Sequence, residues 1–374
     1  MKLKFFCILI ILQVMIACQT FPELGNPTSI TPIIIENLPS NTPLPSATYF
    51  TFTPSPTQET TGTLPSTSTP TKITVTPTSA SIPEITLLFT GVIVPARCVQ
   101  AALDKNGNPD YPYEEVKELL AGADLAIGTF NATMSDQVEH TGCLTTWQLV
   151  GSPDNADALG RAGFDAMGVA TNHIKDCGLM KSWCDTTFFD TLSHLNRVGI
   201  KTVGAGENLE AALKPIVFEI EGVKFGIVSL GDSKMSETVF AQVDHPGIAP
   251  LTEENIKTAL ESARAVSDVV IAMPHWGSED IIIPNWIQRE QAQILVREGA
   301  DLVVGNHTHV VQAIQTIDDV QVFYGLGNFV FDQPWSEQTK KGKIAKVIFT
   351  GREIKTFTEI PIYIKNSSQP DLVR

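Results

Sequence analysis

The feature that most constrains the fold of this chain is an alternation of short apolar runs with amphipathic stretches, which begins near residue 85. The apolar runs, each short enough for a buried strand, occupy residues 85–94, 125–130, 166–171, 269–274 and 301–305. Segments with apolar residues three and four apart lie between several of them, at 114–123, 183–199, 253–267 and 287–300. This alternation predicts an α/β domain whose sheets are buried.

Two segments depart from the alternation and predict antiparallel hairpins. The run 216–230 turns at Gly222, and the run 345–360 turns at Gly351. Glycine tolerates the backbone conformations that tight hairpin turns require. We therefore expect mixed sheets within one folded domain of ordinary size.

The N-terminal part of the chain lacks this pattern and indicates export. Lys2 and Lys4 precede an apolar run that is too short to span a bilayer but suits a secretory signal peptide. The run ends at Cys18, in a context that resembles a bacterial lipobox, where the cysteine is lipidated; an ordinary signal peptide cut nearby is the alternative. The segment that follows is rich in Thr, Ser and Pro and predicts a disordered stalk. The predicted organisation is a lipoprotein signal peptide at 1–18, the stalk at 19–84, the folded domain at 85–366 and a C-terminal tail at 367–374.

Charge and cysteine content indicate which partners and which cellular location to expect. The net charge of −15 gives no reason to expect nucleic acid as a partner. With the lipid anchor, we expect an extracytoplasmic protein attached to the bacterial cell membrane. An even number of cysteines in an exported domain predicts disulfides, and proximity in the chain favours Cys98 with Cys143 and Cys177 with Cys184. A zinc site is the alternative, but these cysteines lack Cys-x-x-Cys spacing.

Polar residues follow three of the apolar runs. Asn172 and His173 follow the run 166–171, His275 follows the run 269–274, and His307 and His309 come soon after the run 301–305. In open α/β sheets, ligands bind beyond the carboxyl ends of strands. His307 and His309 would share a face if their segment is extended. Each residue alone has a structural explanation, such as a buried ring bonded to backbone. Together, neutral imidazoles and an amide oxygen suit Zn²⁺, Mn²⁺ or Fe, so the sequence predicts a metal or phosphate site.

Several segments between residues 85 and 335 resemble, in order, the CapA (PgsA-like) bacterial capsule-synthesis proteins. The stretches ATNHIKDCG, GNHTHVVQ and YGLGNFVFDQ resemble that family's ANNHxxDxG, GxHxHVxQ and YSLGNFxFDQ. The resemblance implies a metallophosphoesterase-like sandwich of two mixed β-sheets flanked by helices, with a two-metal type of centre at the strand ends. It also implies a role in the synthesis, export or attachment of a poly-γ-glutamate type of polymer. The expected partners are this anionic polymer or its synthesis and export machinery.

The resemblance also implies roles for the strand-end residues. Asn172, His275 and His307 would ligate one metal ion, and His309 would ligate the other. His173 would face the substrate as an acid or as a stabiliser of charge.

Two acidic positions of the family pattern are lost in this chain. Val92 stands where the first motif, GDxMxxR, has its Asp, and Asn131 stands where the second has its Glu. Two neighbouring dications repel unless an anion bridges them. We therefore expect at most one divalent ion, Mn, Zn or Fe. Asp136, Asp176 and Asp232 could substitute only if the fold brings them close.

Three hypotheses for the function remain open. The first is a capsule lipoprotein whose metal centre lacks its usual Asp and Glu. The second is an active metal-dependent phosphoesterase or hydrolase with a reduced, mononuclear site. The third is a non-catalytic protein that binds a surface polymer. In each, Arg97 is the basic residue that the first motif places near the substrate cleft.

Overall fold

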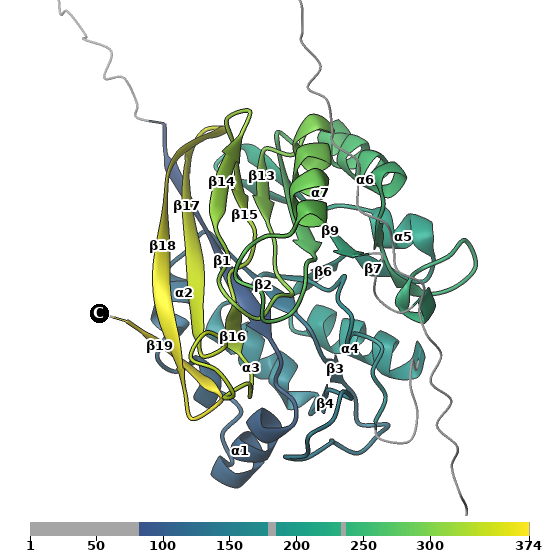
Figure 1. The fold of residues 1–374 in the computed structure, drawn as a ribbon, viewed down its shortest axis with the longest axis vertical. Coiled ribbons are helices and arrows are strands. Elements are labelled where there is room, and N and C mark those ends of the chain that lie inside the picture. The colour runs from purple at the N-terminus through teal and green to yellow at the C-terminus, as the bar shows by residue number, and fades with distance from the viewer. Residues whose placement is uncertain (1–81, 179–184, 233–236, 374) are drawn as a thin grey trace, which may run out of the picture. The chain divides into compact units, whose positions relative to one another are not determined.

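The computed structural model describes residues 82–178, 185–232 and 237–373. In this part of the chain two mixed β-sheets pack face to face, and helices cover their outer sides (Figure 1). The predicted architecture of two mixed sheets flanked by helices is therefore confirmed. The predicted signal peptide and nearly all of the predicted stalk lie outside the described residues.

The first sheet carries the N-terminal strand at its centre. Its strands are β1 (Glu84–Ile93), β2 (Leu125–Phe130), β5 (Ala166–Gly168), β6 (Lys201–Val203), β16 (Asn328–Val330), β17 (Lys341–Thr350), β18 (Glu353–Lys365) and β19 (Gln369–Leu372). They follow the order β19-β18-β17-β1-β2-β5-β6, with β16 paired to β1. Strands β1, β2, β5 and β6 are parallel, whereas β17 to β19 add antiparallel neighbours. Because β19 pairs with β18, the predicted tail contributes a strand to this sheet.

The second sheet is built around five parallel strands. Its strands are β8 (Ile216–Ile220), β9 (Val223–Asp232), β11 (Pro250–Leu251), β12 (Val269–His275), β13 (Leu302–Val304), β14 (Ile314–Ile317) and β15 (Val320–Phe323). They follow the order β11-β9-β12-β13-β15-β14, with β8 paired to β9, and β8 and β14 add antiparallel edges. Both predicted hairpins are confirmed, as β8–β9 and β17–β18. Two short pairs lie apart from the sheets, β3 (Thr133–Met134) with β4 (Val150–Gly151) and β7 (Ala205–Gly206) with β10 (Gly247–Ile248).

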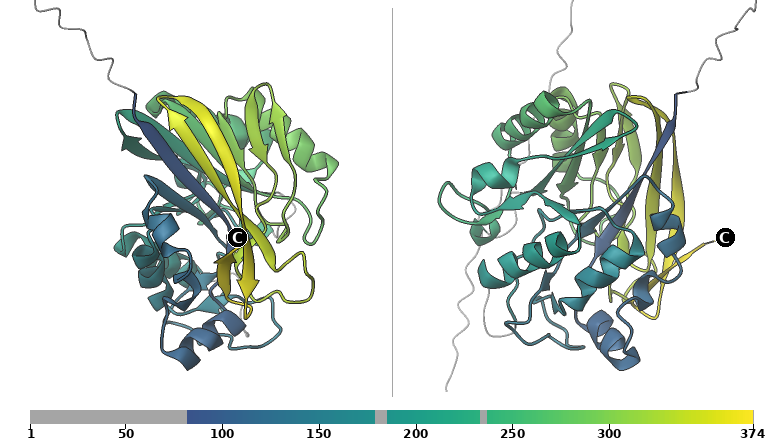
Figure 2. Two further views of the ribbon diagram at one scale, coloured as in Figure 1. Left: turned by 90° about the vertical axis from the view of Figure 1, so that its left-hand side faces the viewer. Right: turned by 180° about the vertical axis from the view of Figure 1, so that it is seen from behind.

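Helices form the two outer layers, which the turned views separate (Figure 2). They are α1 (Cys98–Asn106), α2 (Lys117–Ala121), α3 (Asp154–Ala162), α4 (Asp185–Arg197), α5 (Leu209–Leu213), α6 (Glu253–Val266) and α7 (Trp286–Arg297), with 3₁₀ turns at Tyr111–Tyr113 and Glu237–Val239. Helices α1 to α4 pack on the first sheet and α5 to α7 on the second. None of the helices that the structure describes is long and apolar enough to cross a membrane.

The core between the sheets follows from the two-residue period of the strands. Leu87 and Phe89 of β1 face the second sheet and share one apolar cluster with Phe225 and Ile271, whereas Leu88 faces the helical layer. Strands β12 and β13 are parallel neighbours, so their carboxyl ends open at the same edge. Residues that follow these strands are thereby placed together, which is the geometry that positions the candidate site.

Candidate metal centre

The structure brings together three of the predicted ligands. Asn172 lies in the turn after β5, His275 is the last residue of β12, and His307 follows β13. The Nε2 atom of His275 lies 3.1 Å from Oδ1 of Asn172 and 3.2 Å from Nδ1 of His307. We call Asn172, His275 and His307 the neutral trio. Both sheets contribute to it, because β5 belongs to the first and β12 and β13 to the second.

The spacing of the neutral trio fits one divalent ion. Metal–nitrogen bonds of about 2.0–2.1 Å place adjacent ligand atoms about 3.0–3.4 Å apart. The Asn172 carbonyl oxygen has no proton to donate, and one proton on His275 Nε2 cannot point well at both neighbours. A cation would engage the lone pairs of all three atoms at once. The residues present therefore fit a bound metal ion.

Burial keeps the clustered imidazoles neutral at pH 7. It is the largest cause lowering the pKa of His275 well below its usual value, that of His307 to about 4 and that of His309 to about 3. Repulsion among the rings lowers these pKa values further. Neutral rings have free lone pairs, which a metal ligand requires.

The loop that carries the two histidines is held by a buried amide. Asn306 Nδ2 donates to Thr129 Oγ1 at 2.8 Å and to the Thr90 carbonyl at 3.3 Å, which ties the loop to the opposite sheet. The segment is not extended, contrary to the sequence expectation, because His307 and His309 have positive φ values of 104° and 59°. Such backbone persists only where surrounding contacts fix it. The two rings still face one neighbourhood, with centroids 6.1 Å apart.

His309 belongs to a second group that includes a carboxylate absent from the sequence prediction. Its Nε2 atom lies 4.0 Å from Oε1 of Glu279. Among the described residues, Glu279, His307 and His309 form a group of potential ligands whose donor atoms all lie within 4.8 Å of one another. We call these three residues the acidic trio. Its signal in the sequence was the HWGSED stretch, which places an acid four residues after the strand-end His275.

The aspartates considered as substitutes, Asp136, Asp176 and Asp232, are not members of the acidic trio. Asp176 instead orients His173, whose Nδ1 lies 2.7 Å from Asp176 Oδ2. The same carboxylate oxygen accepts a hydrogen bond from the backbone N–H of Leu149 at 2.8 Å. A carboxylate facing Nδ1 keeps a proton there and leaves Nε2 for other partners. The predicted role of His173 toward substrate stays a prediction.

The two positions that lost their acids are both buried. Val92, at the end of β1, is part of the apolar core. Asn131 accepts a hydrogen bond at Oδ1 from the backbone N–H of His173 at 3.1 Å. Its Nδ2 atom has no hydrogen-bond partner among the described residues. Because this bond uses Oδ1 and leaves the NH₂ group free, the second position offers a donor in place of a metal ligand.

Arg97 is placed differently from its predicted cleft role. Its guanidinium is buried, pairs with Asp332 through Nε and Nη2, and donates from Nη1 to the Thr146 carbonyl at 3.0 Å. It also lies over the Phe331 ring, 5.0 Å from the centroid, and that ring is 5.2 Å from the ring of His309. With its donors engaged in this way, Arg97 holds the loops beside the histidines, and this geometry gives no support to substrate contact.

A disulfide reinforces the same region. Cys98, directly after Arg97, is bonded to Cys143. The backbone N–H of Cys98 also donates to Oδ2 of Asp332 at 3.0 Å. The predicted pairing of Cys177 with Cys184 stays a prediction, because Cys184 lies outside the described residues.

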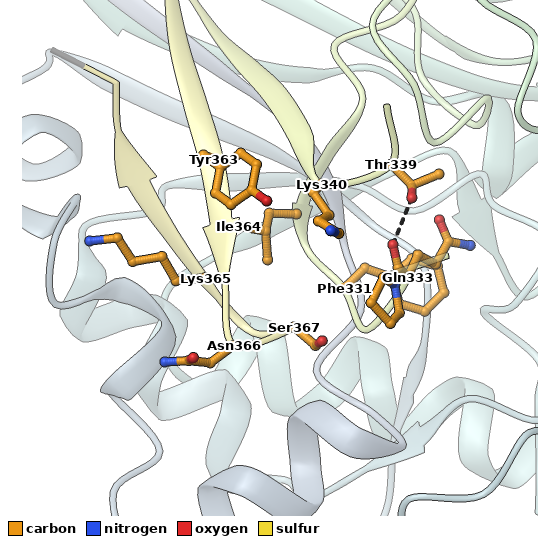
Figure 3. A pocket seen from close by; sticks show the side chains of 10 residues that line it. Phe331, Gln333, Thr339, Lys340, Tyr363, Ile364, Lys365, Asn366 and Ser367 are labelled. Carbon is orange, nitrogen blue, oxygen red and sulfur yellow. Dashed lines mark hydrogen bonds between the residues drawn. The ribbon is translucent and has the colours of Figure 1, made fainter. Parts of the chain in front are cut away.

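A cavity of about 380 Å³ opens next to this region, between the end of β18 and the loop after β16 (Figure 3). Its wall includes Phe331 and Gln333 but no member of either trio. Two lysines also line it, yet Lys340 pairs with Glu337 and Lys365 with Asp371. The cavity therefore does not present free positive charge and is not the predicted metal site.

Comparison with known proteins places the chain among capsule proteins. Residues 86–333 match the model of the family described as bacterial capsule synthesis protein PGA_cap. The chain is 28% identical to the PGA biosynthesis protein CapA of Bacillus subtilis, over 76% of each chain. It is 26% identical to the capsule biosynthesis protein CapA of Bacillus anthracis, over 76% of this chain and 69% of that one. Among solved structures, the NAD nucleotidase of Haemophilus influenzae is similar with a TM-score of 0.43 and 13% identity, over 79% of this chain and 54% of that one.

Proposed function

Because this chain belongs to the bacterial capsule synthesis protein family PGA_cap, we propose that it is a lipid-anchored, extracytoplasmic protein acting in the synthesis, export or attachment of an anionic capsule polymer. Membership of the family supports the role in capsule polymer synthesis. The signal peptide and the lipobox-like context of Cys18 support the anchor and the location. The approach of Asn172 Oδ1 and His307 Nδ1 to the same ring nitrogen of His275 carries the proposal that the protein uses one divalent ion.

In this proposal Asn172, His275 and His307 hold the ion. A bound divalent ion supplies Lewis-acid polarisation of a carbonyl or phosphoryl oxygen. His173 presents its Nε2, as a proton donor or as a stabiliser of negative charge, because Asp176 holds the other ring nitrogen. Its side chain is 15% exposed, so the ring is not closed off from solvent.

Two narrower versions of this function differ in whether the site turns over substrate. An active phosphoesterase or hydrolase would use the single ion alone. A non-catalytic protein would use the site to bind polymer. The residues that now occupy the two formerly acidic positions favour this non-catalytic version. Val92 cannot bind a cation, and the free NH₂ group of Asn131 suits an anionic ligand better than a metal ion.

We expect a strain that lacks this protein to lose most of its cell-associated capsule polymer and to regain it with the unaltered gene. The His275→Ala variant should fail to restore the polymer, because it removes the central donor of the neutral trio. His245→Ala is the matched control, since the His245 ring is exposed and its Nδ1 lies 3.2 Å from Oδ1 of the neighbouring Asp244. The measurement is polymer per cell. Full restoration by His275→Ala would exclude the metal centre from the function, and normal polymer in the deleted strain would exclude the capsule role.

The anchor has its own test. We expect Cys18→Ser to move the protein from the membrane fraction to the soluble extracytoplasmic fraction, because a serine hydroxyl cannot take the thioether-linked lipid. Cell fractionation followed by immunoblotting measures the change. A Cys143→Ser variant controls for the loss of a cysteine as such, since it removes the partner of Cys98 in the folded domain. Retention of the Cys18→Ser protein by membranes would point to another anchor.

A further inference from the structure

We propose that the acidic trio is the primary cation-binding group of this protein, with Glu279 supplying the carboxylate that the family positions at Val92 and Asn131 no longer provide. The inference rests on the proposed metal-dependent function but changes which side chains carry the affinity. The neutral trio then supplies secondary contacts. Because both trios contain His307, one chain binds one ion tightly.

The position of Glu279 is fixed by the backbone around it. It follows His275 by four residues, in the segment that leaves the carboxyl end of β12. The backbone N–H of Asp280 donates to the Thr308 carbonyl at 2.9 Å, which ties this segment to the loop between His307 and His309. Glu279 is thereby held beside both rings. Its side chain is 39% exposed, so an ion can enter from solvent.

Asn328 determines which nitrogen of His309 is free to bind. Its Nδ2 donates to Gln333 Oε1 at 2.9 Å and to the Thr339 carbonyl at 3.0 Å, which fixes the orientation of the amide. Its Oδ1 therefore faces His309 Nδ1 at 2.8 Å and must accept a proton from it. The lone pair is left on Nε2, the atom nearest Glu279. Such outer contacts are how proteins prepare histidines for metal ions.

The loop that orients Asn328 is the one that lines the cavity in Figure 3, where Gln333 and Thr339 are joined by a hydrogen bond. The preparation of His309 is thus built into a packed part of the fold and does not depend on an exposed side chain. Asn328 itself is fully buried. It is a positioning residue, since it acts on the ion only through His309.

The donor chemistry also favours the acidic trio over the neutral one. One carboxylate with two imidazoles is the ligand set of many zinc hydrolases and of non-haem iron sites. An amide oxygen with two imidazoles brings no negative charge to offset that of a dication. Glu279 is the one ionisable acid in the two trios, so its carboxylate sets their relative affinity for a divalent ion.

The test is a calorimetric titration of the full-length, chelator-stripped protein in detergent with Zn²⁺. We expect one tight site per chain, and Glu279→Gln should weaken its affinity by roughly tenfold or more. Asp280→Asn is the matched control, because it removes an adjacent exposed acid that is not a member of the trio, and it should change the affinity far less than Glu279→Gln. His275→Ala should weaken binding less than Glu279→Gln. Gln preserves the size of a side chain that is partly exposed, and circular dichroism checks that each variant is folded.

The outcomes separate this inference from the proposed function. Unchanged affinity in Glu279→Gln, with binding lost in His275→Ala, would overturn the acidic trio and leave the proposed metal-dependent function standing. Absence of tight Zn²⁺ binding to the unaltered chain would overturn both. Nitrogen NMR of ¹⁵N-histidine-labelled protein without metal supplies a further readout: a proton on Nδ1 of His309 supports the role of Asn328, and a proton on Nε2 contradicts it.

Discussion

Asp332→Asn is expected to lower the free energy of unfolding by about 3–5 kcal/mol, because it leaves the buried Arg97 guanidinium without its counter-charge. The side chains of this pair are only 8% and 5% exposed. An asparagine has only one side-chain oxygen, so the change also disturbs the hydrogen bond that the backbone N–H of Cys98 donates to Asp332 Oδ2. Chemical denaturation of the two proteins measures the difference. We further expect weaker metal binding, since Phe331 packs between Arg97 and His309.

The direction in which the pKa of Asp332 is shifted shows why this pair is costly to break yet contributes little net stability. Burial raises the pKa of Asp332 above its usual value, although the Arg97 partner acts to lower it. Desolvation thus outweighs attraction within the pair. Replacing both side chains, as Arg97→Met with Asp332→Leu, should therefore recover much of the stability that Asp332→Asn loses. A double variant as unstable as the single one would contradict this explanation.

An exposed ion pair provides the matched control. Asp110 and Arg161 also form a close ion pair, but their side chains are 43% and 52% exposed. Solvent screens such a pair, so Asp110→Asn should have a several-fold smaller effect on unfolding than Asp332→Asn. Equal effects would mean that burial is not the cause.

The parts of the fold that could be predicted are those with strong periodicity. The four amphipathic segments cover α2, α4, α6 and α7, and the apolar runs cover β1, β2, β5, β12 and β13, each to within one residue at either end. Helices α1, α3 and α5 were not predicted, because they offer few or small apolar residues: α3 buries mainly alanines and Leu159, and α5 has only five residues. The last strand, β19, contains a proline and only four residues, so its pairing with β18 depends on tertiary context.

The site was predictable to the extent that it follows strand ends. His275 and His307 were expected to meet because β12 and β13 carry them to one edge, and the structure places their nitrogens 3.2 Å apart. The proximity of Glu279 to His309 was not predictable, because it depends on a backbone contact between two irregular loops. The ion pair between Arg97 and Asp332 was not predictable either, because the two residues are 235 positions apart in the sequence.

The remaining large effect is a gain of affinity. We expect Asn131→Asp to strengthen divalent metal binding by roughly tenfold or more, because it returns a carboxylate to the position where the family pattern has its bridging acid. One oxygen of the new side chain can accept the His173 N–H bond that Asn131 now accepts. The other replaces an NH₂ group that has no partner among the described residues. Val92 is a poorer place to restore an acid, since it lies within the apolar core.

The effect of the same substitution on stability should depend on whether metal is present. In chelator the buried, unpaired carboxylate is costly, so the melting temperature of Asn131→Asp should fall below that of the unaltered protein. With saturating Mn²⁺ the tighter binding stabilises the folded state, so the gain on adding metal should exceed that of the unaltered protein. Asn155→Asp is the control, because Asn155 is buried to a similar degree and its side chain donates hydrogen bonds to the Pro95 carbonyl and to Gln100, neither of which belongs to a trio. It should lower the melting temperature alike in chelator and in metal. If Asn131→Asp behaves in the same way, the second acidic position no longer faces the ion, and the centre has been remodelled around Glu279.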